Sequence, residues 1–298
     1  MNVTSGVPQG SVLSPSLFAV FLDDLMKADI GSDINSYADD LKLIGIPGTN
    51  LQRDLNVVES WAKSNLMIIN TRKSLVVHLG SANPRVSYSL CDSTLPVNTE
   101  FRDLGLWTDD KLSFKRHVLE VRLKTYRLIN WIFKVFASRD SKIFLSLYKI
   151  YVMPHIDYMD IIYSGSSIAN QKSIERIQRY FTKRLHMRLY PLQTVPDYAK
   201  RLKTFGLTTI ETRRNEHDLI CLYKIANKQM LATNINIKFS LQKSNRIILS
   251  RVRSNSARLF FQHRASVLWN KLISTHPPFS SISELRTFLS NLPASNAR

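Results

Sequence analysis

Thiols and long apolar runs are scarce in this 298-residue chain. Its two cysteines, Cys91 and Cys221, are far apart and lack metal-ligand spacing, so we expect two reduced thiols and no disulfide framework. The longest apolar stretch near the start, Leu17 to Leu22, is far too short to span a bilayer. No basic segment precedes an apolar run in the first twenty residues. We therefore expect neither a signal peptide nor a transmembrane segment, and an intracellular place of action in the nucleus or cytoplasm.

Several catalytic signatures are also missing. The sequence contains no glycine-rich phosphate loop and no nucleophile-elbow motif. The histidines, including His78, His117, His155 and His186, form no cluster with the spacing of metal ligands or of a catalytic triad. We interpret the histidines as structural, and we find no support for a P-loop NTPase or a serine hydrolase.

Acidic residues are scarce in one part of the chain only. Residues 111–298 carry 10 Asp and Glu against 33 Lys and Arg, a net charge of +23, whereas residues 1–110 carry 13 acids against 8 bases, a net charge of −5. A region as basic as residues 111–298 is expected to bind a polyanion, and nucleic acid is the first candidate. An anionic membrane surface is the weaker alternative, because no single helix combines a dense basic face with exposed Trp, Phe and Leu.

The spacing of apolar residues predicts an α+β fold. Residues 1–110 mix helices with antiparallel strands, with helices over 14–26 and 51–63, a hairpin around Asp39, strands at 66–69 and 75–79, and two short strands within 85–107. Ser14 is predicted to cap the first helix and Pro15 to begin it. The rest of the chain is almost wholly helical, with candidate helices over 114–136, 140–152, 167–188, 195–204, 208–230, 260–272 and near 283–289.

Asp39 and Asp40 are the most informative residues of the sequence. They lie between two short apolar segments with strand propensity, so they are expected at the tight turn of a β-hairpin. Two adjacent carboxylates repel each other, and a hard divalent cation such as Mg²⁺ would relieve that repulsion. The alternative is an ordinary polar turn, because Asp is common in turns.

A second motif precedes this pair by about thirty residues. Gly6 to Pro15 reads Gly-Val-Pro-Gln-Gly-Ser-Val-Leu-Ser-Pro, and Tyr37 to Asp40 reads Tyr-Ala-Asp-Asp. Together and in this order, the two motifs resemble the reverse transcriptases of non-LTR (LINE-like, jockey-type) retrotransposons. The resemblance implies a partial polymerase palm in residues 1–110, an all-α, basic thumb in 111–190 and a helical C-terminal extension in 191–298.

The resemblance also implies an RNA-directed DNA polymerase that uses two metal ions for nucleotidyl transfer. Asp39 and Asp40 would be catalytic Mg²⁺ ligands, and Lys73 would approach the triphosphate and protonate the leaving pyrophosphate. Template and substrate contacts would come from Pro8, Gln9, Gly10, Ser11, Tyr37 and Ala38. The implied partners are an RNA template, a DNA primer and a dNTP, within an intracellular ribonucleoprotein. The alternatives are a Pro-Gly loop that merely leads into a helix, and a solvated turn lysine at Lys73.

The predicted helix over 167–188 has two contrasting faces. Lys172, Arg176, Arg179 and Lys183 follow one another at steps of four, three and four residues, which makes one basic stripe. An apolar stripe of Ile174, Ile177, Phe181 and Leu185 lies opposite. A basic stripe suits a phosphate backbone. A merely solvated face is the alternative, and the near absence of acids, with Glu175 alone, favours nucleic acid.

The third carboxylate of a polymerase palm is not among these motifs. In the family it lies upstream of the Pro-Gln-Gly motif, after the fingers, and we expect both to be absent from this chain. Asp23 and Asp24 are predicted on the polar face of the helix that follows that motif. We therefore expect the chain to be catalytically incomplete and inactive by itself. The competing hypothesis is a module that binds RNA–DNA hybrid without catalysis.

Overall fold

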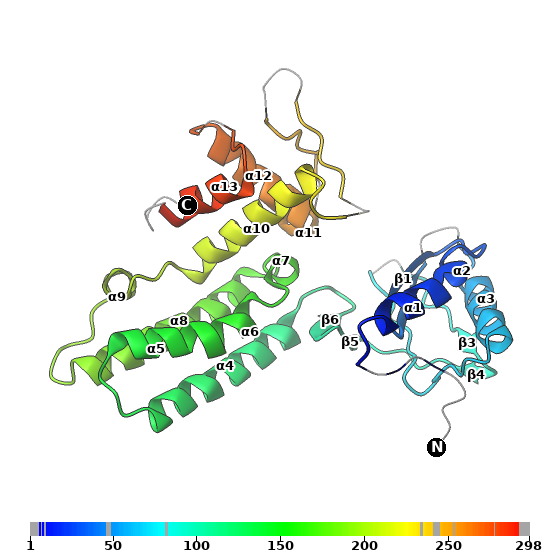
Figure 1. The fold of residues 1–298 in the computed structure, drawn as a ribbon, viewed down its shortest axis with the longest axis horizontal. Coiled ribbons are helices and arrows are strands. Elements are labelled where there is room, and N and C mark those ends of the chain that lie inside the picture. Colours follow the sequence, from blue (N-terminus) through cyan, green and yellow to red (C-terminus); the bar gives the residue numbers. More distant parts are fainter. Residues whose placement is uncertain are drawn as a thin grey trace. The chain divides into compact units, whose positions relative to one another are not determined.

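The computed structural model describes residues 6, 8, 10–45, 49–80, 83–232, 235–240, 245–252, 254–276 and 278–291. The chain forms two compact units, residues 1–101 and 102–298 (Figure 1). Helices and small antiparallel strand pairs together confirm the predicted α+β class. The functional limits expected at residues 110 and 190 stay predictions. No helix in the described part of the chain has the length and apolar character that a membrane crossing requires.

The first unit is built around a small core. Its elements are α1 (Ser14–Phe21), α2 (Asp23–Met26), β1 (Asp33–Tyr37), β2 (Asp40–Ile44), α3 (Leu51–Ser64), β3 (Ser89–Leu90) and β4 (Ser93–Thr94). Leu22, Leu25 and Val58 are buried at its centre, and Ile34 and Leu43 of the hairpin pack against them. Because Ile34 and Leu43 are directly opposite each other on β1 and β2, this pair holds one end of the hairpin on the core.

Two local predictions for this unit are wrong. The helix over 14–26 is interrupted at Leu22, and its N-cap is Leu13; Ser14 instead donates its hydroxyl to the Pro8 carbonyl oxygen at 2.5 Å. Residues 66–69 and 75–79 form no strands apart from an isolated bridge between Val76 and Val97. Leu66 and Ile68 are more than 90% exposed, whereas Ile69 and Val76 pack on hydrophobic clusters of the unit, so these runs bury single residues without pairing as strands.

Asp54 ties α3 to the start of β1. Its buried carboxylate accepts hydrogen bonds from the Gly31 backbone N–H at 3.2 Å, the Ser32 backbone N–H at 2.9 Å and the Ser32 hydroxyl at 2.5 Å. Burial acts to raise the pKa of Asp54, but the hydrogen bonds from Ser32 and Gly31 outweigh it and hold the pKa below its ordinary value. The charged carboxylate is therefore an anchor for the hairpin.

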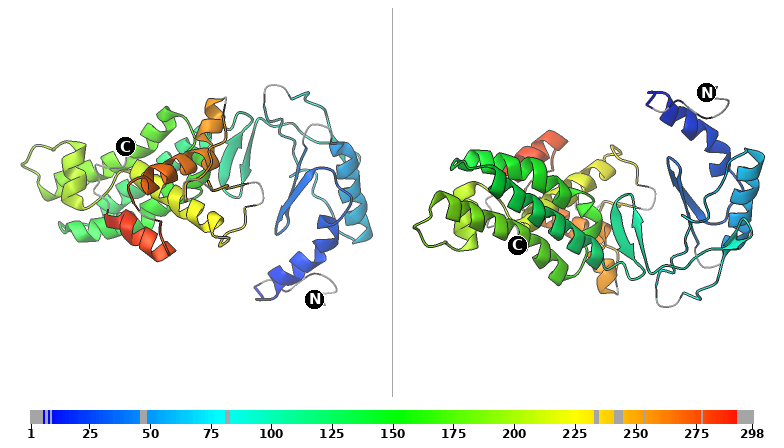
Figure 2. Two further views of the ribbon diagram at one scale, coloured as in Figure 1. Left: turned by 90° about the horizontal axis from the view of Figure 1, so that it is seen from above. Right: turned by 90° about the horizontal axis from the view of Figure 1, so that it is seen from below.

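The second unit contains two cores joined by one helix. Its elements are β5 (Glu100–Asp103, which begins at the unit boundary), β6 (Leu106–Asp109), α4 (Lys115–Val135), α5 (Ser141–Leu147), the π-helix η1 (Tyr148–Val152), α6 (Met153–Asp157), α7 (Asp160–Tyr163), α8 (Ile168–Leu189), α9 (Tyr198–Phe205), α10 (Ile210–Ala226), α11 (Asn255–Leu259), α12 (Phe261–Ile273) and α13 (Ile282–Asn291). The larger core lies among α4, α5, η1, α6 and α8, and the smaller among α10, α12 and α13. Figure 2 shows the ribbon of these helices, coloured by sequence, from two further sides. Helix α10 serves both, because Ile210 belongs to the first core and Leu222 to the second.

A glycine closes the β5–β6 hairpin. Leu104 and Gly105 have φ angles of +44° and +89°, a left-handed pair that suits a tight hairpin turn. The Leu104 carbonyl oxygen accepts a hydrogen bond from the Tyr158 hydroxyl. A Cβ on Gly105 would meet the Tyr158 ring at 3.3 Å, so both backbone angle and space favour glycine.

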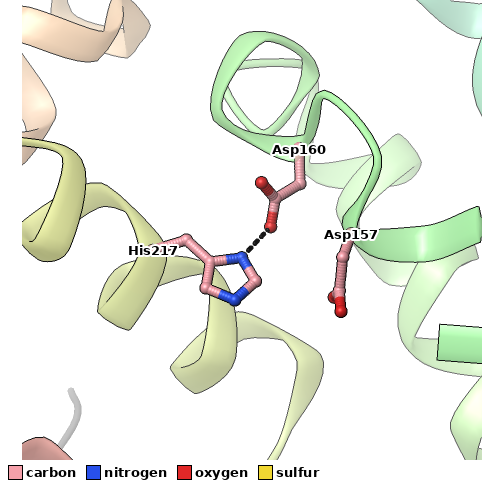
Figure 3. Close-up of side chains that lie close together, drawn as sticks. All are labelled: Asp157, Asp160 and His217. Atoms are coloured by element: carbon pink, nitrogen blue, oxygen red, sulfur yellow. Dashed lines mark hydrogen bonds and ion pairs between the residues drawn. The ribbon is translucent and has the colours of Figure 1, made fainter. Parts of the chain in front are cut away.

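Two ion pairs hold α10 against the α6–α7 segment. Arg213 donates its Nε and Nη2 to the Asp157 carboxylate at 2.7 to 3.1 Å, and Nδ1 of His217 lies 2.6 Å from Oδ2 of Asp160 (Figure 3). The bond to Asp160 raises the pKa of His217 above its ordinary value. We refer to these four residues as the α10 clamp.

The Asp54 anchor predicts that Asp54→Ala destabilises the first unit. Three donors lose their acceptor, which costs about 1–3 kcal/mol of unfolding free energy. Because the folded pKa is lowered, this contribution is present above the ordinary Asp pKa and is lost as the pH falls through the folded value. Hydrogen exchange of the hairpin amides measures the loss. Asp33→Ala, which changes an exposed carboxylate on β1, is the control; equal effects of the two variants would contradict the anchor.

The α10 clamp predicts a pH-dependent stability of the opposite sign. A raised folded pKa means that the charge of His217 stabilises the fold below the ordinary His pKa of 6.5, and that this part is lost as the pH rises through the folded value. His217→Gln keeps a neutral donor and removes the charge. In thermal unfolding, the difference between wild type and variant should therefore be largest at acid pH and shrink at alkaline pH. A difference that does not change with pH would rule out the charge effect.

Candidate functional site

The tip of the β1–β2 hairpin presents two carboxylates. Tyr37 pairs directly with Asp40, so Ala38 and Asp39 form a two-residue turn. Ala38 has a φ of +51°, and its left-handed backbone allows the reversal. Both carboxylates are exposed, and in the described part of the chain neither makes a hydrogen bond or an ion pair. The tip therefore concentrates negative charge that its own unit leaves uncompensated.

The register explains why these acids face solvent. The Ile34–Leu43 pair is seated on the core at one end of the hairpin, and the turn is at the other end. Tyr37, beside the acids, is 66% exposed, and Ala38 is exposed too. The sequence thus brings Tyr37, Ala38, Asp39 and Asp40 together at one tip. Their roles in substrate and metal binding stay predictions.

The other predicted contacts lie in loops of the same unit. Pro8, Gly10 and Ser11 precede α1, where the Ser11 backbone N–H donates to the Pro8 carbonyl oxygen at 3.3 Å; Gln9 lies outside the described residues. Gly10 has a φ of +83°, and a Cβ there would meet nothing within 4 Å. The loop therefore has a left-handed bend with open space around it.

Lys73 closes a tight turn. Its backbone N–H donates to the Asn70 carbonyl oxygen at 3.1 Å, and its side chain is exposed. Ile69, just before the turn, packs on the same core as the hairpin. The small core of the first unit thus anchors both the acidic tip and the segment that carries Lys73.

Among the described residues, no third metal ligand lies beside Asp39 and Asp40. Within the described ranges, the one group of three possible ligand atoms within 4.8 Å of one another is Asp157, Asp160 and His217, in the second unit. Asp23, on α2, forms an ion pair with Lys27. The chemistry of the two hairpin carboxylates fits a hard divalent cation, but two ligands are fewer than a two-metal centre needs.

The Asp157–Asp160–His217 cluster was missed in the sequence, where the histidines showed no ligand spacing. Its two acids are three residues apart, while Arg213 and His217 are four apart on one face of α10. A short acidic segment and a basic face on a later helix were the signal for this cluster that the sequence contained. Because Arg213 already binds both oxygens of Asp157, the cluster is satisfied as a structural ion-pair network.

Helix α8 has the two faces that its sequence predicts. Ile174, Ile177, Phe181 and Leu185 are 0% exposed, while Lys172, Arg176, Arg179 and Lys183 are all exposed. The one acid of the helix, Glu175, is turned inward, where it accepts hydrogen bonds from the Tyr198 hydroxyl and the Ile210 backbone N–H. The Arg179 guanidinium lies 4.2 Å from the Tyr198 ring centroid. The outer face of α8 is therefore basic along its length.

Comparison with known proteins relates this chain to polymerases of mobile elements. Residues 1–113 match the family described as reverse transcriptase (RNA-dependent DNA polymerase). The RNA-directed DNA polymerase from mobile element jockey of Drosophila melanogaster is 25% identical over 72% of this chain and 26% of its own length. Its counterpart from Drosophila funebris is 26% identical over 59% of this chain and 21% of its own length.

The probable RNA-directed DNA polymerase from transposon X-element of Drosophila melanogaster is 27% identical over 59% of this chain. The chain spans between a fifth and about a quarter of the length of these relatives. No solved structure matches it. The predicted resemblance is confirmed: residues 1–113 match the reverse transcriptase family, and the chain is similar to RNA-directed DNA polymerases of non-LTR mobile elements.

Proposed function

We propose that this chain carries the metal-binding hairpin and the nucleic-acid-binding helices of an RNA-directed DNA polymerase. The observation that carries the proposal is the tip of the β1–β2 hairpin, where Asp39 and Asp40 are adjacent, exposed and unpaired within the described residues. Oxygen ligands of this kind suit Mg²⁺. When bound, such a cation would neutralise the charge that builds on a transferring phosphate.

The residues around the acids would receive the substrates. Ala38 is small, which leaves room for the primer end beside Asp39, and exposed Tyr37 offers a ring for packing. Gly10 gives open space for close approach of a nucleic-acid backbone. We assign template and dNTP contacts to Pro8, Gln9, Gly10 and Ser11. The exposed Lys73 ammonium would meet the triphosphate and supply a proton to the leaving pyrophosphate.

We further propose that the chain does not polymerise by itself. In-line transfer between two metal ions needs more oxygen ligands than Asp39 and Asp40 supply, and the described residues offer no third ligand beside them. Two carboxylates should bind a divalent cation weakly.

Binding of RNA–DNA hybrid without catalysis is the second candidate function. The exposed basic stripe of α8 favours it, because the inward position of Glu175 leaves Lys172, Arg176, Arg179 and Lys183 on one outer face. A basic stripe along a helix can follow a phosphate backbone. Bound to RNA, the chain would act within an intracellular ribonucleoprotein.

The hairpin proposal predicts weak binding of Mn²⁺, used as a probe for Mg²⁺, that is lost in Asp39→Asn/Asp40→Asn. Electron paramagnetic resonance of free Mn²⁺ measures this binding directly, so the test does not depend on polymerase activity. Asp157→Asn is the control for the other acidic cluster and should leave the hairpin signal unchanged. Unaltered Mn²⁺ binding in the hairpin variant would refute the assignment.

Primer extension by the wild-type chain that Asp39→Ala abolishes would refute the claim that the chain is inactive alone.

The binding proposal predicts the effect of neutralising the α8 stripe. Lys172→Gln/Arg176→Gln/Lys183→Gln, which spares Arg179 and its stacking on Tyr198, should weaken binding of an RNA–DNA hybrid. The slope of log affinity against log salt should fall by about 1 for each phosphate contact that is lost. Fluorescence anisotropy titrations at several salt concentrations measure both.

Lys200→Gln/Lys203→Gln/Lys228→Gln removes the same charge from exposed positions elsewhere in the unit. If this control weakens binding and flattens the salt dependence as much as the stripe variant does, net charge alone explains binding and the stripe is not the site. Asp39→Asn should leave hybrid binding intact, which separates the two candidate functions.

A further inference from the structure

An aromatic pair of α4 and η1 lies on the surface of the second unit. Trp131 of α4 is 47% exposed and Tyr151 of η1 is 46% exposed. Their rings meet edge to face, with centroids 6.2 Å apart and an interplanar angle of 70°. Trp131 meets Phe136 in a similar way, with centroids 6.2 Å apart. Exposed aromatic clusters of this kind are typical of binding surfaces.

The core does not need these two rings. Helix α4 fills the core with Ile129, Ile132 and Phe133, and η1 with Tyr148 and Val152. Tyr148 and Val152, four residues apart on η1, share its inner face, and both are 0% exposed. The three residues between them, which include Tyr151, are left on the outside. The π turn thus supports the core while it presents an aromatic side chain to solvent.

Exposed cations flank Trp131 along α4. Lys124, Arg127 and Lys134 are exposed and lie seven and four residues before, and three residues after, Trp131, so they share its flank of α4. Lys149 is exposed two residues before Tyr151. Burial and, to a smaller extent, the charge of Lys124 lower the pKa of His155. Glu120 is the one acid in the sequence of α4.

We propose that this basic–aromatic surface, formed by Trp131, Tyr151 and the flanking cations, binds single-stranded RNA by stacking its unpaired bases. The cations favour a polyanion, and the exposed rings favour bases that are free of a duplex, because paired bases offer no face for stacking. The choice of RNA rests on the proposed function, since an RNA-directed DNA polymerase copies an RNA template. The surface would hold unpaired template, whereas the α8 stripe would hold the hybrid.

The test compares two double variants of the full chain. Trp131→Leu/Tyr151→Leu keeps apolar bulk but removes stacking, and Trp131→Phe/Tyr151→Phe keeps rings. The probe is a fluorescein-labelled oligouridylate of about 12 nucleotides, a length within the range that single-strand-binding modules cover. By anisotropy, the Leu variant should bind about 5- to 100-fold more weakly than wild type, the range known for loss of base stacking. The Phe variant should stay close to wild type.

Three further measurements make the result specific. Leu119→Ala changes a side chain of α4 with the same 46% exposure as Tyr151 and should leave binding unchanged. An abasic oligonucleotide with the same number of phosphates should bind wild type as weakly as oligouridylate binds the Leu variant. The Leu variant should bind RNA–DNA hybrid as wild type does, which also shows that it is folded.

An oligouridylate affinity that is unchanged in the Leu variant would overturn the proposal. The exposed rings would then indicate a binding surface for a protein partner instead. An equal loss of hybrid and oligouridylate affinity would also overturn it, because the rings would then serve the fold and not unpaired bases. Absence of hybrid binding by the wild-type chain would refute the hybrid-binding function alone, because the Leu and Phe comparison with single-stranded RNA is independent of it.

Discussion

The second unit depends on how α8 separates its two kinds of residue. One helix has to fill a core with Ile174, Ile177, Phe181 and Leu185 and keep a basic outer face. Its one acid, Glu175, lies among the basic residues in sequence yet is turned inward. Burial raises the pKa of Glu175, but the Tyr198 hydroxyl and the Ile210 backbone N–H hydrogen-bond its carboxylate. The same contacts attach α9 and α10 to α8, so one carboxylate both orders the unit and keeps its charge off the basic face.

The first unit has the opposite electrostatic character. Its core is small, and the hairpin tip is acidic and unpaired within the described residues, whereas residues 111–298 carry the basic excess. Adjacent carboxylates at a turn destabilise a fold unless a cation binds between them. The placement of Asp39 and Asp40 side by side at an exposed turn is therefore the feature on which the proposed cation site rests.

Strongly periodic segments could be predicted from the sequence, and short apolar runs could not. The period of α8 fixed both of its faces, and the pattern around Asp39 located the hairpin, because the burial of Ile34 and Leu43 sets its register. Leu66 and Ile68 have strand propensity but no neighbouring strand, and propensity alone does not form a sheet. The α10 clamp joins residues more than fifty positions apart, a pairing that spacing along a chain does not reveal.

Helix α10 has a consequence for the cooperativity of unfolding. It contributes Ile210 to one core and Leu219, Leu222 and Tyr223 to the other, so one helix forms part of both cores. If the smaller core opened, α10 would lose packing along its C-terminal half. The ion pairs of the α10 clamp are on the same helix, between the residues that fill the two cores. The two cores of residues 102–298 should therefore melt in one transition and not as independent modules, although each has a separate set of buried residues.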